Sequence, residues 1–469
     1  MAHTEERLGT EKIGKLMLSM GIPTLIAQVI NLLYNIVDRM YIGHLVGAEA
    51  LTGVGLTLPI ILLITAFSAF IGAGGAPLAA IAMGQGDKKK AETILANAVT
   101  LLCCFSVVLM VVFFCVEKPF LYAIGASDVT YTYAGEYLRV YLLGTVFVQI
   151  SIGLNPFITA QGQSKIAMCS VLIGAVINIV LDPVFIVLFK MGVKGAAWAT
   201  VISQCAGAIW VLHFLTSQGT SLRIKAKYLK LKKAIVGPVM ALGIAPFIMQ
   251  STESLISIVL SSGLQKYGGD IYVGSLTILQ SIMQLIHIPI SGFTQGVQPV
   301  LSYNFGAGNI DRVKKTYKTL IAITTVASFI VTLSAMMFPG MYALIFTDDA
   351  ELIAVVKRVM PIFVAGMLVF GVQMGCQTTF MGLGQAKISL FIALLRKVFL
   401  LVPFAIIFPI ITGDVMSIYY AECTADVLAA TVCGILFICN IRKILNRGPK
   451  QKNGCGLSRN YLLPSACNT

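Results

Sequence analysis

The sequence predicts an all-α integral membrane protein with twelve transmembrane helices in two pseudo-symmetric six-helix bundles around a central cleft. Three observations support this prediction: the composition, a series of apolar runs and an internal repeat. Of the 469 residues, 57% are hydrophobic and only 12% are charged, whereas a soluble chain has about 25% charged residues. A soluble domain could not bury this much apolar surface, so most of it must face lipid.

Apolar runs of helical length alternate with short polar breaks along the whole chain. The runs cover approximately 16–43, 51–81, 93–115, 134–160, 166–189, 195–216, 235–263, 271–303, 317–338, 359–382, 388–411 and 416–440. They divide the chain into an N-terminus (1–15), a first bundle (16–216), a basic linker (217–234), a second bundle (235–440) and a tail (441–469) that we expect to be disordered.

Lys and Arg are distributed unevenly between the two sides of these spans. One set of loops and both termini carry 24 of them, whereas the other set of loops carries six. Because positive residues concentrate in cytoplasmic loops, we expect both termini to lie in the cytoplasm. This asymmetry also explains the formal net charge of +14, so we do not expect a nucleic-acid partner.

The two halves of the chain repeat each other with one constant shift. MGQGDKKKAE (83–92) resembles FGAGNIDRVKK (305–315), and AQGQSK (160–165) resembles GLGQAK (382–387). A shift of 222 residues pairs Gly21 with Gly243, Gly74 with Gly296, Gly84 with Gly306 and Gly144 with Gly366. Each half has an even number of spans, so the repeats are parallel, and two such bundles suit transport by alternating access.

Asp182 lies in the apolar segment NIVLDP (178–183), where burial of a carboxylate costs free energy, so we expect it to have a function. At about 1.5 Å per residue, Asp182 lies about 12 Å deep, and Asp38 and Thr200 about 9 Å deep. Asn178 shares a helix face with Asp182. These four residues would form an oxygen-rich pocket for Na⁺, or a proton site if burial keeps the carboxyl groups protonated. In a purely structural alternative, Asp38 pairs with Arg39 and Asp182 bonds a neighbouring side chain.

In the second bundle, Glu253 lies about 20 Å deep, near the middle of the membrane. The polar residues near it are Gln250, Gln280, Gln284, His287 and Gln373. A carboxylate among amides, Met and aromatic residues suits an organic cation. The glutamines could instead pack helices together, and His287 could be a satisfied core residue. Glu422 and Asp426, four residues apart, are a second candidate proton site.

Four segments carry a resemblance to a known family: YNIVDRMYIG (34–43), NPFITAQGQSK (155–165), NIVLDP (178–183) and QGVQPVLSYNFGAGN (295–309). They resemble the multidrug and toxic compound extrusion (MATE) transporters, closest to the MepA-like bacterial branch. The resemblance implies two six-helix bundles around a V-shaped cleft. It also implies a location in the bacterial cell (inner) membrane and export of cationic amphipathic compounds in exchange for Na⁺ or H⁺.

The resemblance also assigns the candidate site residues by position. The family's cation site in the first bundle falls on Asp38, Asn178, Asp182 and Thr200. Glu253 resembles a seventh-helix carboxylate of sodium-coupled members, but the partner Asp of their tenth helix is missing from 359–382. We therefore expect the coupling site in the first bundle.

The favoured function is a secondary antiporter for small organic cations such as drugs and dyes. It would work as a monomer, with Na⁺ or H⁺ as coupling ion and no other cofactor. The alternative is a lipid-linked oligosaccharide flippase of the same superfold. Its cleft would need cations for the pyrophosphate group, and the spans contain Arg39, Arg139, Arg396 and Lys397. No HExxH or Walker A motif is present, so we expect neither an enzyme nor direct ATP coupling.

Overall fold

The structure is a computed structural model that describes residues 3–448, and this part of the chain contains helices and no strands. The first bundle consists of α2 (Ile13–Tyr41), α3 (Ala48–Gly84), α4 (Lys88–Ala123), α5 (Asp128–Leu143), α6 (Thr145–Ala160), α7 (Ser164–Pro183) and α8 (Val193–Thr216). The second consists of α9 (Lys233–Gly268), α10 (Asp270–Gly306), α11 (Ile310–Met337), α12 (Pro339–Leu344), α13 (Ala350–Phe363), α14 (Phe370–Gly382), α15 (Ala386–Leu394), α16 (Val402–Thr412) and α17 (Met416–Arg447).

The predicted two-bundle membrane fold is confirmed, with one difference in the spans. Within residues 3–448, ten helices are long and apolar enough to cross a membrane, and eleven if α5 and α6 count as one span bent by 60°. The predicted span 359–382 is divided among α13, a 3₁₀ turn at Ala365–Leu368 and α14. No unbroken helix of this segment is therefore long enough to cross alone.

Both broken spans break at glycines that the 222-residue shift pairs. A Cβ at Gly144 would lie 2.5 Å from Cγ2 of Val201, and a Cβ at Gly366 would lie 2.5 Å from Cβ of Asp426. In each bundle the fourth span therefore bends where its backbone packs against the sixth span. The apolar pattern runs through both breaks, so hydropathy alone could not reveal them.

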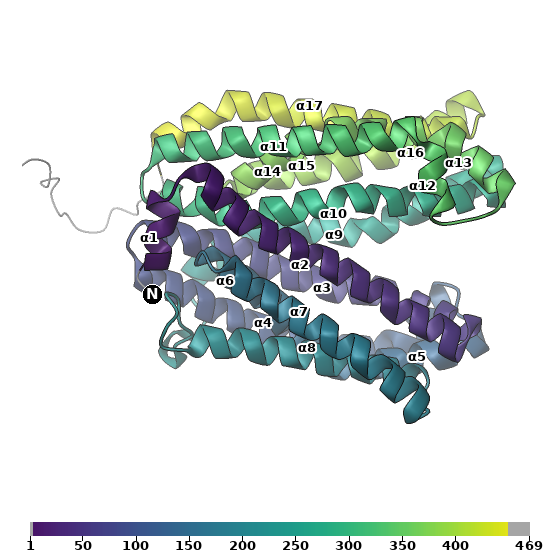
Figure 1. The fold of residues 1–469 in the computed structure, drawn as a ribbon, viewed down its shortest axis with the longest axis horizontal. Coiled ribbons are helices and arrows are strands. Elements are labelled where there is room, and N and C mark those ends of the chain that lie inside the picture. Colours follow the sequence, from purple (N-terminus) through teal and green to yellow (C-terminus); the bar gives the residue numbers. More distant parts are fainter. Residues whose placement is uncertain (1–2, 449–469) are drawn as a thin grey trace, which may run out of the picture.

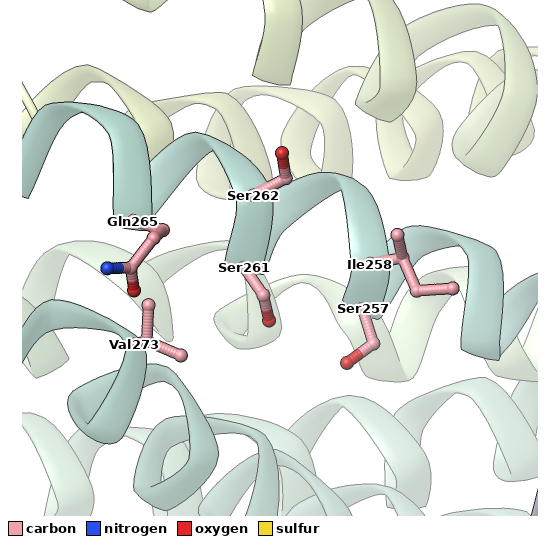
Figure 2. A pocket seen from close by; sticks show the side chains of 6 residues that line it. All are labelled: Ser257, Ile258, Ser261, Ser262, Gln265 and Val273. Carbon is pink, nitrogen blue, oxygen red and sulfur yellow. The ribbon is translucent and has the colours of Figure 1, made fainter. Parts of the chain in front are cut away.

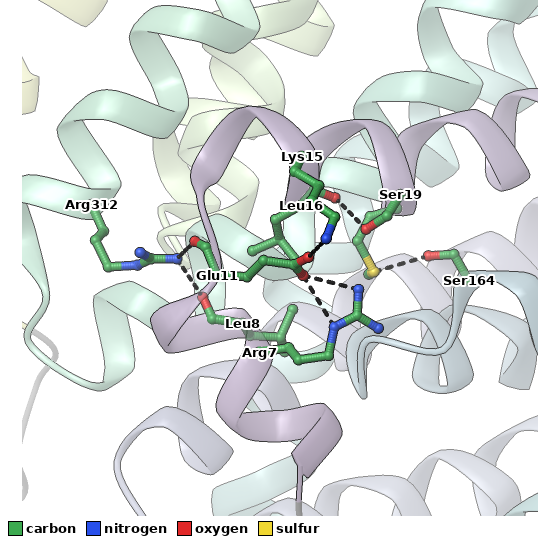
Figure 3. Close-up of polar contacts among 9 residues, drawn as sticks. Arg7, Leu8, Glu11, Lys15, Leu16, Ser19, Ser164 and Arg312 are labelled. Carbon is green, nitrogen blue, oxygen red and sulfur yellow. Dashed lines mark hydrogen bonds and ion pairs between the residues drawn. The ribbon is translucent and has the colours of Figure 1, made fainter.

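The ends of the chain differ from the predicted boundaries. The predicted N-terminal segment contains a short helix, α1 (His3–Thr10), and α17 continues past the predicted end at 440 to Arg447. Arg312 on α11 donates to the carbonyl oxygens of Leu8 (3.2 Å) and Glu11 (2.8 Å), which ties α1 to the second bundle (Figure 3). The remainder of the predicted tail, 449–469, lies outside the described residues.

The basic linker is docked on α4. The Asn97 amide donates to the carbonyl oxygens of Tyr228 (2.9 Å) and Lys230 (3.2 Å), and its oxygen accepts from the Lys232 amide (2.8 Å). Lys225 forms an ion pair with the buried Glu92 at 2.7 Å. The linker therefore marks one end of the molecule, which we call the linker end.

The two bundles meet at the linker end and diverge toward the opposite end (Figure 1). At the linker end, Gly74 packs against Gly243, and Gly296 packs against Gly21. The 222-residue shift converts each of these contacts into the other, so the paired glycines of the repeat form a pseudo-twofold interface. A side chain at Gly74, Gly243 or Gly296 would collide with the backbone of the other bundle, and one at Gly21 would collide with the ring of Phe293.

Glycines in the opposite half contact only their own bundle. A Cβ at Gly53 would meet Thr130 and Tyr133, and one at Gly268 would meet Tyr272 and Val415. The closed interface therefore ends near mid-depth. Two amide contacts cross it there: Gln28 to Gln295 at 3.1 Å and Gln250 to Thr65 at 2.8 Å.

Candidate functional site

The structure brings together the four residues predicted to form a cation site. Asn178 and Asp182 come from one face of α7, and the Asn178 amide donates to Asp182 (3.3 Å). The same amide lies 3.5 Å from the hydroxyl of Thr200 on α8. Asp38 on α2 lies within hydrogen-bonding reach of the Asp182 carboxyl group. Three helices thus contribute oxygen atoms to one small volume, which we call the N-bundle pocket.

The N-bundle pocket has unused acceptor capacity. All four side chains are buried, and Asp182 and Asn178 are fully buried. Among residues 3–448, three of their oxygen atoms have no hydrogen-bond partner: Oδ1 of Asp38, Oδ1 of Asn178 and Oδ2 of Asp182. Buried polar oxygens are normally paired, and two adjacent carboxylates repel each other unless a cation or a proton lies between them. Hard monovalent cations and protons both suit such a donor set.

Two tyrosines that were not predicted from the sequence line the N-bundle pocket as well. Tyr137 on α5 is within hydrogen-bonding reach of the Thr200 side chain, and it interacts electrostatically with both aspartates. Tyr34, one turn before Asp38 on α2, also interacts with Asp38. The four-residue spacing of Tyr34 and Asp38 was a readable signal. Tyr137 had none, because only the packing of α5 against α8 places it there.

π-Helical turns lie next to, or contain, the buried charged residues of both bundles. Residues Ile42–Val46 and Val184–Leu188 form π-helical turns immediately after the helices that carry Asp38 and Asp182. The third π-helical stretch in the described chain is η5 (Leu395–Leu401), which contains Arg396 and Lys397. Single π-helical turns often occur at functional sites because they alter the direction of side chains.

In the second bundle, the predicted substrate carboxylate is already paired. Glu253 on α9 forms a close ion pair with Lys397 of η5. The Lys397 ammonium also donates to the carbonyl oxygen of Met249, at 3.1 Å. The Glu253 side chain is 64% exposed, whereas that of Lys397 is 9% exposed. The lysine therefore approaches Glu253 from the bundle interior.

A second buried ion pair lies next to Lys397. Arg396 contacts Asp426 at 2.6 Å and Glu422 at 3.8 Å, both on α17. Oε2 of Glu422 and Oδ2 of Asp426 are buried without a hydrogen-bond partner in the described part of the chain. We call Arg396, Lys397, Glu253, Glu422 and Asp426 the C-bundle charge cluster. Glu422 and Asp426 thus face a guanidinium group rather than forming an isolated carboxyl pair.

The other predicted substrate residues fall into two groups. Gln250 lies at the bundle interface, and the side-chain amide of Gln280 lies 3.4–3.5 Å from the Ser257 hydroxyl on α9.

His287 lies near the charge cluster instead. Its ring centroid is 5.2 Å from that of Phe370, and the Arg396 guanidinium lies over the same Phe370 ring at 5.7 Å. Gln373, one turn after Phe370, is buried, and its Oε1 has no hydrogen-bond partner within the described chain. Gln284 is exposed.

A hollow of about 420 Å³ begins one turn beyond Glu253, toward the end opposite the linker end, which we call the open end. Its lining residues come from α9 and α10: Ser257, Ile258, Ser261, Ser262, Gln265 and Val273. Figure 2 shows that Ser257, Ser261 and Gln265 point to the same side of α9, toward α10. A polar stripe therefore leads along α9 to the Glu253 carboxylate.

Comparison with known proteins now places the chain in a family. The family model MatE matches it twice, at residues 23–184 and 245–407. The chain belongs to the MATE family. The two matches begin 222 residues apart, the same shift that relates the paired glycines. Each MatE unit thus corresponds to one bundle, and the chain is a multi-pass membrane protein of a transporter family.

Individual MATE proteins support this assignment over nearly the whole chain. Multidrug export protein MepA of Staphylococcus haemolyticus (strain JCSC1435) is 25% identical over 442 residues, which cover 93% of this chain and 94% of that protein. Multidrug export protein MepA of Staphylococcus aureus (strain NCTC 8325 / PS 47) is 24% identical and covers 90% and 94%. A MATE crystallised in a bent conformation superimposes with a TM-score of 0.89 at 23% identity, covering 95% and 98%.

Proposed function

We propose that this MATE protein is a secondary active multidrug antiporter that exports cationic amphipathic compounds in exchange for Na⁺ or H⁺. The N-bundle pocket carries the proposal, because two buried carboxyl groups on different helices face each other with unpartnered oxygens. Intramembrane carboxyl groups are costly and usually serve ion movement. The relatives named as multidrug export proteins support the substrate class.

Alternating access gives the pocket its role in coupling. The bundles touch at the linker end through the glycine contacts and separate beyond mid-depth. An ion that enters from the open end neutralises the repulsion between Asp38 and Asp182, and this stabilises one packing of α2 against α7. Because a ligand shifts a conformational equilibrium only through its differential affinity, this change in packing can bias the bundles.

The orientation and location belong to the same proposal. Both described ends of the chain lie at the linker end (Figure 1), and the excess of Lys and Arg lies on the same side. We infer that the linker end faces the cytoplasm of a bacterial cell and that the open end faces outward. Substrate would then leave from the half in which Glu253 is exposed.

The intramembrane cations weigh against the flippase alternative. Arg139 contacts Glu117 at 2.6 Å, Arg396 contacts Asp426, and Lys397 contacts Glu253. Three of the four cations within the spans are thus neutralised by carboxylates. A pyrophosphate group would have to compete with these carboxylates.

Ethidium efflux from reconstituted vesicles tests the proposal. Wild type is compared with Asp182→Asn under a Na⁺ gradient alone and a proton gradient alone. We expect gradient-driven efflux in wild type and a loss of about tenfold or more in Asp182→Asn. Asp311→Asn, an exposed carboxylate at the linker end, is the control and keeps wild-type efflux. Equal efflux from wild type and Asp182→Asn under both gradients refutes the coupling role, and absence of wild-type efflux refutes the antiporter.

A further inference from the structure

We propose that Lys397 is a built-in competitor for the positive charge of the substrate. In the substrate-free protein its ammonium group occupies the Glu253 carboxylate. An organic monocation binds at Glu253 by displacing this ammonium toward the buried carboxylates of α17. This inference rests on the proposed function, because it assumes that organic cations are the substrates.

Glu253 is placed to meet a substrate from the open end. Three residues earlier on α9, Gln250 bonds Thr65 across the bundle interface, so Glu253 lies just beyond the closed part. Its side chain is 64% exposed, and the polar stripe of the α9–α10 hollow begins at Ser257, one turn further. A cation that moves along this stripe reaches the Glu253 carboxylate before any other acid of the cluster.

Lys397 reaches the same carboxylate from the opposite side. The backbone of η5 directs its side chain toward α9, where the ammonium contacts both Glu253 and the carbonyl oxygen of Met249. Since 91% of the lysine side chain is shielded, the ammonium cannot stay unpaired without a large cost in free energy. Displacement from Glu253 therefore requires a second acceptor.

The α17 carboxylates provide that acceptor. Glu422 and Asp426 share the Arg396 guanidinium, and each retains one buried oxygen that has no hydrogen-bond partner among the described residues. Lys397 already interacts electrostatically with both. A modest movement of a flexible lysine side chain thus exchanges one carboxylate partner for another.

The charge balance of the cluster matches one incoming positive charge. Three carboxylates face two cations, so the five described side chains have one negative charge in excess when all are ionised. A bound monocation brings the total to zero, with Glu253 paired to the substrate and Lys397 to α17. A neutral compound of the same shape cannot displace the ammonium, so the arrangement selects for charge.

Tetraphenylphosphonium binding to the full chain in lipid nanodiscs, measured by calorimetry, tests this inference. Lys397→Gln removes the charge but retains an amide donor for the Met249 carbonyl. We expect Lys397→Gln to bind the cation about tenfold more tightly than wild type, because the competitor is gone. Lys397→Arg, which retains a competing cation, should stay within about threefold of wild type. Neutral triphenylphosphine oxide should bind Lys397→Gln no more tightly than it binds wild type.

The higher tetraphenylphosphonium affinity of Lys397→Gln must depend on Glu253. In the Glu253→Gln background, adding Lys397→Gln should leave the affinity unchanged. Lys397→Gln/Glu422→Gln removes one charge of each sign, so it keeps the cluster balance if the single variant does not fold, and it should show the same gain. Unchanged or weaker binding in the folded Lys397→Gln proteins overturns the inference, as does a gain that survives without Glu253.

The proposed function and this inference can fail separately. If wild type exports ethidium but removal of Lys397 leaves tetraphenylphosphonium affinity unchanged, only the competitor role is wrong. If wild type neither binds the phosphonium ion nor exports ethidium, both are wrong.

Discussion

Gly74 on α3 packs against Gly243 on α9, so that a Cβ at Gly74 would lie 2.9 Å from the Gly243 Cα atom. Gly74→Ala should therefore destabilise the closed linker end by about 1–3 kcal/mol, the usual cost of overpacking. We expect the bundles to populate states with a separated linker end and efflux to slow. Distances between spin labels on α3 and α9, measured by pulsed electron resonance, check this shift.

The same two helices provide matched controls for Gly74→Ala. At Gly55 on α3 and Gly237 on α9, an added Cβ would have no neighbouring atom of the described residues within 4 Å. Gly55→Ala and Gly237→Ala should leave both the label distances and efflux unchanged, with any change in stability below about 1 kcal/mol. A closed linker end in Gly74→Ala would show that the glycine contact does not govern closure.

Asn97 should control the accessibility of the linker. Asn97→Ala removes three hydrogen bonds between α4 and the backbone of 228–232, each worth about 0.5–1.5 kcal/mol. We expect trypsin to cut the chain between 223 and 233 about tenfold faster. Asn440→Ala, which loses only a bond within its own helix, is the control. Equal cutting rates in wild type and Asn97→Ala would show that other contacts dock the linker.

The repeat was the most reliable guide to the fold. A shift of 222 residues predicted two parallel bundles, and the structure explains why the shift is visible through glycines. Gly21, Gly74, Gly243 and Gly296 lie where backbones of different bundles touch, so no larger residue fits. The breaks at Gly144 and Gly366 were missed because only the approach of another helix distinguishes these glycines from other small residues in an apolar run.

Arg396 should be essential for the stability of the second bundle. Arg396→Met leaves Glu422 and Asp426 buried without a cationic partner other than Lys397, and breaking a buried ion pair costs about 3–5 kcal/mol. We expect a lower melting temperature in detergent, measured by intrinsic fluorescence.

Lys314→Met, which removes an exposed pair with Asp311, is the control for Arg396→Met and should change the stability by less than about 1 kcal/mol. A melting temperature equal to that of wild type would show that the cluster is not an ion-pair network in the native protein.

The site in the first bundle could be predicted from the sequence more fully than the one in the second bundle, and the reason is physical. In the N-bundle pocket, Asn178 and Asp182 share a helix face, and similar depths placed Asp38 and Thr200 beside them. In the C-bundle charge cluster, Glu253 was expected to be free for substrate. Its pairing with Lys397 depends on how the π-helical stretch η5 is turned toward α9, and neither depth nor helix periodicity contains that information.

Tyr137 should tune the N-bundle pocket without contacting the substrate path. Tyr137→Phe removes a hydroxyl group within reach of Thr200 and close to both aspartates, while the buried ring stays. Removing a polar group beside buried carboxyl groups changes their free energy by about 1–3 kcal/mol. We therefore expect the coupling-ion concentration that gives half-maximal efflux to rise about tenfold, with little change in melting temperature.

Tyr141→Phe is the matched control for Tyr137→Phe. Tyr141 is equally buried one turn later on α5, and its electrostatic neighbour is Tyr34 rather than an aspartate. Efflux as a function of coupling-ion concentration, measured at saturating ethidium, separates the two variants. If both shift the curve equally, the Tyr137 hydroxyl acts through helix packing; if only Tyr137→Phe shifts it, the hydroxyl contributes to the pocket itself.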